Sequence, residues 1–400
     1  MRACVRLDDG VESFWFLVME GLRQGCVLAP LLFNIFFAAV LMIAAKKIEA
    51  DELAQKGVIN IISRLDVNPL KATASKPRKA KTKRTMRALW SMLYADDAGV
   101  ASLQQDSLSR IMTIIVETCT KFGLSVSEPK TKTLCFRTSN DADEGIVHEM
   151  RIEAAGQKYE QQDKFVYLGS LQTQDHDISP ELSKRSSNSW FKMKRYSKSI
   201  FDAKKGIQLG IKTRMYKAEV LPTLLYGCET WTLRVEDMDM LRSIHHRQLL
   251  RLIGFRRKRG QYRTLSYKRA LSKTKCESIA TIIHKLRLKF AGRVARMDDA
   301  RLPKFMLFGE LNTGEKNAGR PEKTWRQCLR DSLKHFEIHA EQWHNFATEG
   351  EGEWTKRITE GAKKHMIRWH EREAAEAAKR HRDREAVRKD EDAAAADSGI

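Results

Sequence analysis

Apolar and polar residues divide the chain into a front part of short mixed patterns and a back part of long helical ones. Residues 1–20 alternate loosely around "DDG", which predicts two strands joined by a turn. Residues 28–45 ("LAPLLFNIFFAAVLMIAA") form an apolar run of 18 residues, at the lower limit for a membrane span. Pro30 near its start and Asn34 inside it favour a buried helix with Pro in the first turn.

Between residues 88 and 136 the pattern is typical of strands beside one helix. Residues 88–103 ("ALWSMLYADDAGVASL") predict a strand, a tight turn and a second strand. Residues 108–122 place apolar side chains on one helical face, and Gly123 is the expected stop. Residues 124–136 predict a further strand, in which Pro129 marks an edge position or a turn.

From Ser179 onward the apolar spacing is helical. Ser179 followed by Pro180 is a favourable helix start, with Ser as the cap and Pro at the first position. The predicted helices cover 180–200, 207–226, 236–253, 264–300 and 322–336. From about 355 the chain is rich in Ala, Glu, Lys and Arg, which predicts a solvated helix that frays into a disordered tail.

These patterns predict an α+β protein, with an antiparallel sheet and helices in front and helices alone behind. A chain of 400 residues is long enough for two or three domains. The mixed pattern in front, the helical pattern from Ser179 onward and the charged end, assigned to 346–400, divide the chain along its length. A basic insertion covers about 46–88. Its residues 71–87, which include no acidic residue, are interpreted as a flexible loop, either a solvated linker or a contact to phosphates.

The net charge of +21 narrows the classes of partner. Such a basic chain attracts polyanions, of which nucleic acid is the first choice and an acidic membrane surface the second. A basic surface that is merely solvated is the alternative. The seven cysteines show neither CxxC pairs nor zinc-finger spacing, which indicates reduced thiols inside the cell. Acidic residues before the apolar run argue against a signal peptide, so no secretion is expected.

The segment Tyr94-Ala95-Asp96-Asp97 is the strongest chemical signal. Two adjacent carboxylates on a tight turn can chelate Mg²⁺, which prefers oxygen ligands and shares its shell with substrate phosphates. A pair of metal ions held this way can support in-line nucleotidyl transfer. Asp is also common in turns, so a plain polar turn is the alternative.

Several ordered stretches together resemble a reverse transcriptase, more narrowly the polymerase of non-LTR (LINE-type) retrotransposons. The resemblance covers roughly residues 1–345. The stretches are "GLRQGCVLAPLLFN" (21–34), "YADD" (94–97), "FGLSVSEPKTKTL" (122–134), "FVYLGS" (165–170) and the blocks at 211–233, 241–254 and 290–311. It implies that 1–175 is a partial palm domain, that 176–260 is a helical thumb and that 261–345 is a helical C-terminal region.

The resemblance also implies a role for each matching residue. Asp96 and Asp97 match the paired metal ligands for Mg²⁺ or Mn²⁺, and Lys130 matches a lysine that neutralises the leaving pyrophosphate, with Lys132 as the alternative. The residues expected to bind nucleotide and template are Arg23, Gln24, Gly25 and Tyr94. The hairpin expected to grip the primer contains Tyr167, Leu168 and Gly169. Without the ordered set, a capping, solvated or core role would be favoured for Gln24, Lys130 and Tyr167.

The helical segment after residue 176 matches the polymerase thumb, which would track a primer–template duplex through its phosphates. The residues expected to contact the nucleic-acid backbone are Lys184, Arg185, Lys194, Lys212, Arg214, Arg256, Arg257, Lys258 and Arg259. A solvated surface is the alternative for any single one of them. His245 and His246 are helix neighbours that do not converge on one metal, so a structural or surface role is expected.

Two departures from the family shape the expected function. Ser127 stands where the family has Asn. The family's first catalytic carboxylate lies on an earlier strand that has no counterpart before Gly21, so N-terminal truncation and loss of polymerase activity are expected. The expected partners are an RNA template, a DNA primer and dNTP, with no membrane, and nuclear residence is what the family implies. The alternative is a non-catalytic remnant that binds RNA or DNA through its basic thumb.

Overall fold

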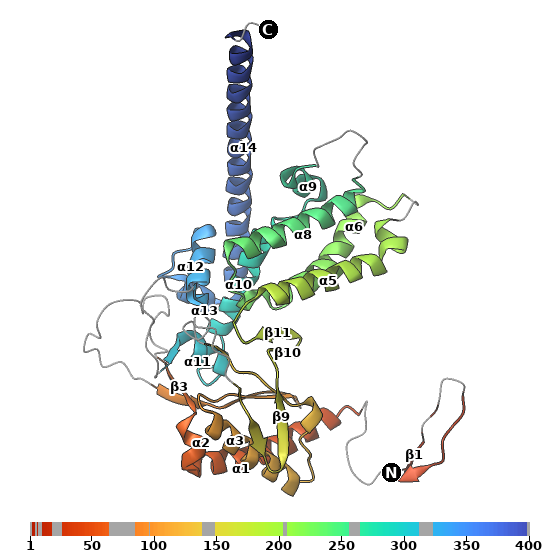
Figure 1. Ribbon diagram of the computed structural model, residues 1–400, viewed down its shortest axis with the longest axis vertical. Helices are drawn as coiled ribbons and strands as arrows, with labels where there is room; N and C mark the ends of the chain where they lie inside the picture. The colour runs from red at the N-terminus through yellow and green to blue at the C-terminus, as the bar shows by residue number, and fades with distance from the viewer. Residues whose placement is uncertain are drawn as a thin grey trace, which may run out of the picture. The chain divides into compact units, whose positions relative to one another are not determined.

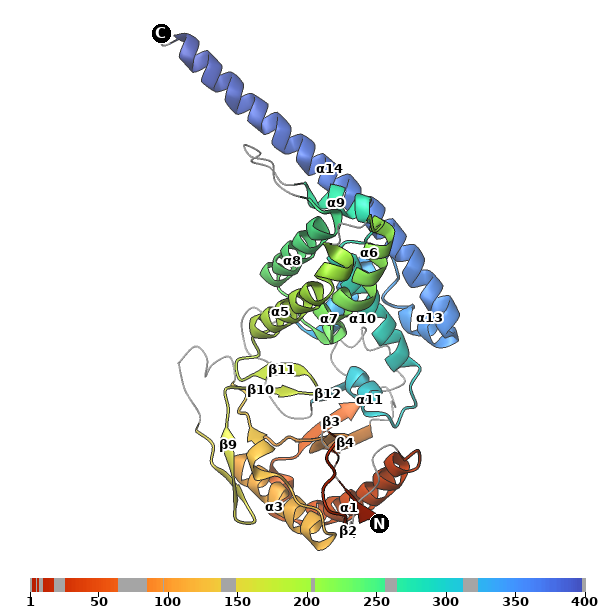
Figure 2. The same cartoon turned by 90° about the vertical axis from the view of Figure 1, so that its right-hand side faces the viewer.

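The computed structural model describes residues 2–4, 6, 10–17, 26–63, 85–95, 97–137, 149–202, 206–255, 265–311 and 323–397 (Figures 1 and 2). The chain forms two compact units. Unit 1 contains residues 1–60, 87–135 and 143–163, and unit 2 contains 61–86, 136–142 and 164–400. The four-part division predicted from the sequence stays a prediction, and the contacts group the segment 164–173 with the helices that follow it.

The core of unit 1 forms where two long helices pack together. α1 (Ala29–Ala50) lies against α3 (Gln105–Lys121), and the short α2 (Glu52–Lys56) contacts both. α3 buries one apolar face, as its spacing predicts, and ends before Gly123, which has a φ of +75°. The buried apolar residues are Val40, Ile48, Ala54, Val58, Ile111, Met112, Ile114, Ile115, Cys119, Ile152, Ala154 and Tyr159.

The prediction that the apolar run 28–45 forms a buried helix is only partly right. α1 buries a narrow stripe that includes Val40, Ala44 and Ile48, spaced four residues apart. Most of its other apolar side chains are exposed among the described residues, including Leu31 at 57% and Ile35 at 60%. The reason is that neighbouring elements cover a single face of a helix that is apolar all round. By length and composition α1 is also the one described helix that could cross a membrane.

The strands of unit 1 form three small groups. β1 (Arg2–Ala3) pairs antiparallel with β2 (Phe16–Leu17), which confirms the predicted N-terminal hairpin. β5 (Ser91–Tyr94) pairs antiparallel with β6 (Asp97–Val100). β9 (Gln157–Gln161) lies between β7 (Lys132–Thr133) and β8 (Ile152–Ala154), parallel to the first and antiparallel to the second.

The strand predicted over 124–136 is wrong for most of its length. Its centre is the 3₁₀ turn η1 (Glu128–Lys130), and only β7 (Lys132–Thr133) is extended and paired. Pro129 lies in the first turn of η1, where its missing N–H and fixed φ fit. The chain crosses between the units within β3 (Ile59–Ser63) and β4 (Thr85–Leu89), which form a sheet of order β12-β3-β4 with β12 (Gly309–Leu311).

Among its described residues, unit 2 is helical apart from β12, the parts of β3 and β4 that belong to it, and one hairpin, β10 (Lys164–Tyr167) with β11 (Ser170–Thr173). Its helical elements are α5 (Ser179–Arg195), the π-helical turn η2 (Ser197–Phe201), α6 (Leu209–Met215), a second π-helical turn η3 (Tyr216–Val220), α7 (Leu221–Leu224), the 3₁₀ turn η4 (Cys228–Thr230), α8 (Val235–Ile253), α9 (Tyr267–Thr274), α10 (Ile279–Ala295), α11 (Leu302–Phe308), α12 (Trp325–His335), α13 (Trp343–Glu349) and α14 (Glu351–Asp397). The α+β class and the helical back part are therefore confirmed.

The last helix differs from the expected solvated helix with a frayed end. α14 continues to Asp397, because Ala, Glu, Arg and Lys all favour helix. Its first part is not solvated: Trp354, Ile358 and Ala362 are buried in a core shared with α10 and α12. Trp354 lies against Gly292 of α10, where a Cβ would overlap the indole ring. Figure 1 shows α14 continuing beyond the other helices of unit 2.

Candidate active site and nucleic-acid interface

The YADD segment forms the tip of a two-residue β-hairpin. The register pairs Tyr94 of β5 with Asp97 of β6 across the turn that begins at Ala95. Ala95 has a φ of +53°, a left-handed conformation that such tight turns require. Asp97 is exposed, and Tyr94 beside it is 66% exposed. The hairpin therefore presents a carboxylate and an aromatic ring together to solvent.

Carboxylate oxygens at this tip suit a divalent cation such as Mg²⁺. Asp97 makes no ion pair with the described residues, and Asp96 itself lies outside them. Across the part of the chain that the structure describes, no group of three ligating side chains includes Asp97. The β5–β6 pair is also a sheet of two strands among the described elements. Among the described residues, the carboxylate that the YADD turn contributes is that of Asp97.

The two candidate lysines for the leaving group differ in their surroundings. Lys130 is exposed in η1 and forms no ion pair with the described residues. Lys132 forms an ion pair with Glu160 across the β7–β9 pair. An unpaired ammonium can approach a phosphate without first losing a protein partner. The environment therefore favours Lys130 over Lys132 as the candidate that contacts the leaving pyrophosphate.

The predicted primer-grip residues form the turn of the β10–β11 hairpin. Tyr167 pairs with Ser170, which leaves Leu168 and Gly169 as the two turn residues. Both have positive φ, +47° and +82°, as a type I′ turn requires. A leucine in this region is unfavourable because of its Cβ, so the surroundings must hold the turn.

A buried ion pair on α5 provides part of that support. Arg185 Nε donates to Glu181 Oε1 at 2.6 Å, and both side chains are almost completely buried. Arg185 Nη2 donates to the carbonyl oxygen of Gly169 at 2.6 Å. Glu181 Oε2 accepts from the backbone N–H of Leu171 at 2.9 Å. The pair thus connects both sides of the turn to α5.

Two further side chains complete the attachment. The hydroxyl of Tyr226 donates to the carbonyl oxygen of Leu168 at 3.1 Å. The Arg185 guanidinium lies 4.5 Å from the centre of the Tyr226 ring, which places a cation on its π face. Lys184 Nζ donates to the Gly169 carbonyl oxygen at 3.1 Å. These contacts therefore hold the turn of the β10–β11 hairpin against α5 and Tyr226.

The expected phosphate contacts fall into three groups. Arg185 is buried and fully engaged, so the backbone contact predicted for it is corrected to a structural role. Lys184 and Lys212 each donate to a backbone carbonyl oxygen, Lys212 to that of Phe201 at 2.7 Å. Lys194 and Arg214 are exposed and form no ion pair with the described residues, so they are the most accessible of the predicted cations that the structure describes.

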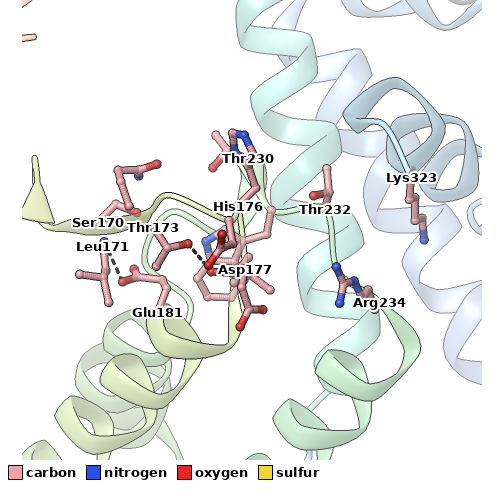
Figure 3. A pocket seen from close by; sticks show the side chains of 14 residues that line it. Ser170, Leu171, Thr173, His176, Asp177, Glu181, Thr230, Thr232, Arg234 and Lys323 are labelled. Atoms are coloured by element: carbon pink, nitrogen blue, oxygen red, sulfur yellow. Dashed lines mark hydrogen bonds between the residues drawn. The ribbon is translucent and has the colours of Figure 1, made fainter. Parts of the chain in front are cut away.

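A polar pocket of about 450 Å³ opens beside the hairpin. Figure 3 shows Ser170 and Thr173 on one side and Arg234 and Lys323 on the other. The sequence interpretation had assigned neither Arg234 nor Lys323, which are far apart in the chain. Its acidic lining residues are Asp175, Asp177 and Glu181, of which Glu181 pairs with Arg185 and Asp175 with Arg137. The pocket is thus lined by polar and charged groups from the hairpin and the helical core.

Several predicted site residues lie outside the described residues. They are Arg23, Gln24, Gly25, Asp96, Arg256, Arg257, Lys258 and Arg259. Their roles stay predictions.

Comparison with known proteins agrees with the hairpin geometry. The model of the reverse transcriptase (RNA-dependent DNA polymerase) family matches residues 1–171. This segment belongs to the reverse transcriptase family. A transposon-derived protein of Caenorhabditis elegans is 25% identical over 250 residues, which are 62% of this chain and 86% of the relative. No solved structure matches the chain significantly.

The family match covers the YADD turn, Lys130 and the turn of the primer-grip hairpin. Reverse transcriptases depend on divalent metal ions and act on a nucleic-acid template with nucleotide substrates. The side chains that hold the β10–β11 hairpin come from α5 and from Tyr226, which lie beyond the matched segment. Glu181 and Arg185 are four residues apart on a helix, a spacing that indicates an ion pair. Nothing in the sequence indicates that this pair binds the hairpin.

Proposed function

We propose that this chain carries the metal-binding turn and the primer-binding elements of a non-LTR retrotransposon reverse transcriptase. The observation that carries the proposal is the two-residue hairpin at the YADD segment, which brings Tyr94 opposite Asp97 at an exposed tip. The similarity to a transposon-derived protein supports an origin in a transposable element.

Asp96 and Asp97 would hold Mg²⁺ or Mn²⁺, because both are hard cations that prefer carboxylate oxygens. When bound, such an ion polarises phosphoryl oxygens and neutralises the charge that develops on pyrophosphate. Tyr94 would place its ring beside the primer terminus. Lys130 would donate a hydrogen bond to the leaving group from its exposed ammonium.

The duplex would lie along α5 and the hairpin that α5 holds. Lys194 and Arg214 would contact its phosphates, since both are exposed and unpaired among the described residues. Such contacts read no sequence and depend on salt. The pocket beside the hairpin supplies Arg234 and Lys323 as further cations.

Binding and catalysis place different demands on the chain. Two-metal transfer needs more carboxylates than one turn provides, and no third ligating side chain joins Asp97 among the described residues. We therefore propose that the chain binds primer–template without extending it. The alternative is an active polymerase in which a carboxylate from another segment completes the site.

The test compares the full chain with the double variant Asp96→Asn, Asp97→Asn, which keeps side-chain size and removes both charges. Primer extension is measured on poly-rA with an oligo-dT primer and Mg²⁺. Binding to the same duplex is followed by fluorescence anisotropy at several salt concentrations with EDTA present. We expect no extension by either protein and equal, salt-sensitive binding.

Extension that is lost in the double variant would contradict the proposed inactivity and support the complete polymerase. Extension that appears only after a separately expressed N-terminal palm fragment is added would identify the source of the missing carboxylate. Absence of duplex binding at low salt would contradict the proposal as a whole.

A further inference from the structure

Three histidines from distant parts of the chain meet inside unit 2. His284 lies on α10, His335 ends α12 and His365 lies on α14. One ring nitrogen from each lies within 4.8 Å of the other two. The ring centroids are 4.7 Å apart for His284 and His335, 5.3 Å for His335 and His365, and 5.7 Å for His284 and His365.

The hydrogen bonds around His284 determine its tautomer. Nδ1 of His284 lies 2.9 Å from the Ser332 hydroxyl oxygen. That hydroxyl already gives its single proton to the carbonyl oxygen of Cys328 at 2.8 Å, so it accepts from His284. Nδ1 therefore carries the proton, and Nε2 keeps a free lone pair. This is the arrangement of a metal-bound imidazole, whose other nitrogen donates to a second group.

His365 has a matching partner on α10. Its Nδ1 lies 2.9 Å from the hydroxyl oxygen of Thr281, one helical turn before His284. The ring of His335 makes aromatic contacts but no hydrogen bond among the described residues. Phe336 closes one side of the group, with its ring 6.1 Å from His284 and 5.8 Å from His365.

Burial lowers the pKa of His284 and His335, and it lowers the pKa of His365 to about 4. The charged groups that act on them are the cations Arg287, Lys323, Lys334, Arg368 and Arg372 and the carboxylate Asp331.

We propose that His284, His335 and His365 form a binding site for a divalent transition-metal ion of the Zn²⁺ class. Tetrahedral Zn²⁺ holds its nitrogen ligands about 3.3 Å apart, so modest ring rotations close the present spacing. Three imidazoles bind Zn²⁺ or its neighbours and disfavour Mg²⁺. Water would fill the fourth position. The ion would fix α12 and α14 to α10, independently of the polymerase turn in unit 1.

The experiment uses the full chain without a histidine tag, stripped with chelator and dialysed. ZnCl₂ is titrated calorimetrically, with MgCl₂ as the comparison ion. We expect one Zn²⁺ per chain and no binding of Mg²⁺ at this site. At a free Zn²⁺ concentration 100 times Kd, the melting temperature should rise by about 5 °C. Cobalt(II) should give the intense visible absorption of tetrahedral coordination.

His335→Ala removes the ligand that has no hydrogen-bond partner among the described residues, and Ser332→Ala removes the partner that sets the tautomer of His284. Both should weaken Zn²⁺ binding at least roughly 10-fold, by comparison with the usual loss of a supporting hydrogen bond. His339→Ala, at an exposed position outside the cluster, should bind as the unsubstituted chain does. Equal affinity in His335→Ala and His339→Ala would overturn the proposal. If His335→Ala does not fold, an octahedral cobalt spectrum of the unsubstituted chain would overturn it.

Discussion

Nη2 of Arg185 lies 2.6 Å from the carbonyl oxygen of Gly169, which joins α5 to the turn of the β10–β11 hairpin. The same guanidinium is held by Glu181 and covered by the ring of Tyr226. Arginine is suited to this position because its planar fork can donate in two directions at once. The hairpin's orientation is therefore set by α5, and the two elements are expected to act as one surface toward a duplex.

Arg185→Met should destabilise unit 2 by about 3–5 kcal/mol, because it leaves the buried carboxylate of Glu181 without its partner. Urea unfolding measures the loss. Hydrogen exchange at the amide of Leu171, which donates to Glu181, should become faster than exchange in the core of α10. Lys184→Met is the matched control, since Lys184 donates to the same carbonyl oxygen from a more exposed position and should cost less than about 1 kcal/mol. Similar losses in the two variants would show that the ion pair does not hold the hairpin.

The double variant Lys194→Ala, Arg214→Ala should reduce the salt dependence of duplex binding. Each lost phosphate contact lowers the slope of log K against log salt by roughly 0.9. The measurement is fluorescence anisotropy with a DNA duplex between low and moderate salt. Lys192→Ala is the control, because Lys192 already forms an ion pair with Glu219 at 3.3 Å. An unchanged slope in the double variant would show that Lys194 and Arg214 do not contact the phosphates of the duplex.

Gly292→Ala should destabilise the α10–α14 contact by about 2–4 kcal/mol. The added methyl overlaps the indole of Trp354, whose Nε1 donates to the carbonyl oxygen of Leu288 at 2.9 Å. Thermal unfolding detects the loss. Gly210→Ala on α6 is the matched control, because a Cβ there meets no neighbour. It should leave stability unchanged or raise it by about 0.5 kcal/mol. Equal melting temperatures would mean that α14 does not pack against Gly292.

Acid should destabilise unit 2 partly through His245. The side chain is fully buried, its Nδ1 faces the hydroxyl of Tyr267 at 2.7 Å and its Nε2 has no partner among the described residues. Burial, with a smaller effect of His246, lowers the pKa of His245 to about 3. Since the unfolded chain binds this proton near pH 6.5 and the folded chain does not, stability falls as the pH drops from 6.5 toward 3.

Through His245 alone, the free energy of unfolding should change by up to about 1.4 kcal/mol per pH unit. Urea unfolding in EDTA at a series of pH values between 7 and 4 measures it. His245→Phe should flatten the curve by about one proton, although the loss of the Tyr267 contact lowers stability at every pH. His339→Phe, at an exposed position, should leave the slope unchanged. An identical slope in His245→Phe would mean that the ring is protonated in the folded chain.

Features that depend on neighbours along the chain could be predicted from the sequence. The YADD turn, the amphipathic helix over 105–121 and the helical back part follow from local spacing and turn chemistry. The resemblance to reverse transcriptases also rests on ordered local motifs. Adjacent helix positions diverge, which predicts a structural or surface role for His245 and His246, and His245 is buried.

Which side chains are buried by other elements, and which distant residues of the chain come together, could be learned only from the three-dimensional structure. Arg185 has the same local pattern as its basic neighbours, yet it is buried because the hairpin turn and Tyr226 lie over it. α1 is apolar all round, and only its packing partners determined which stripe is buried. His284, His335 and His365 show no metal-binding spacing because three helices bring them together. Local sequence encodes backbone preference, whereas burial and convergence depend on contacts between distant elements, which no local pattern records.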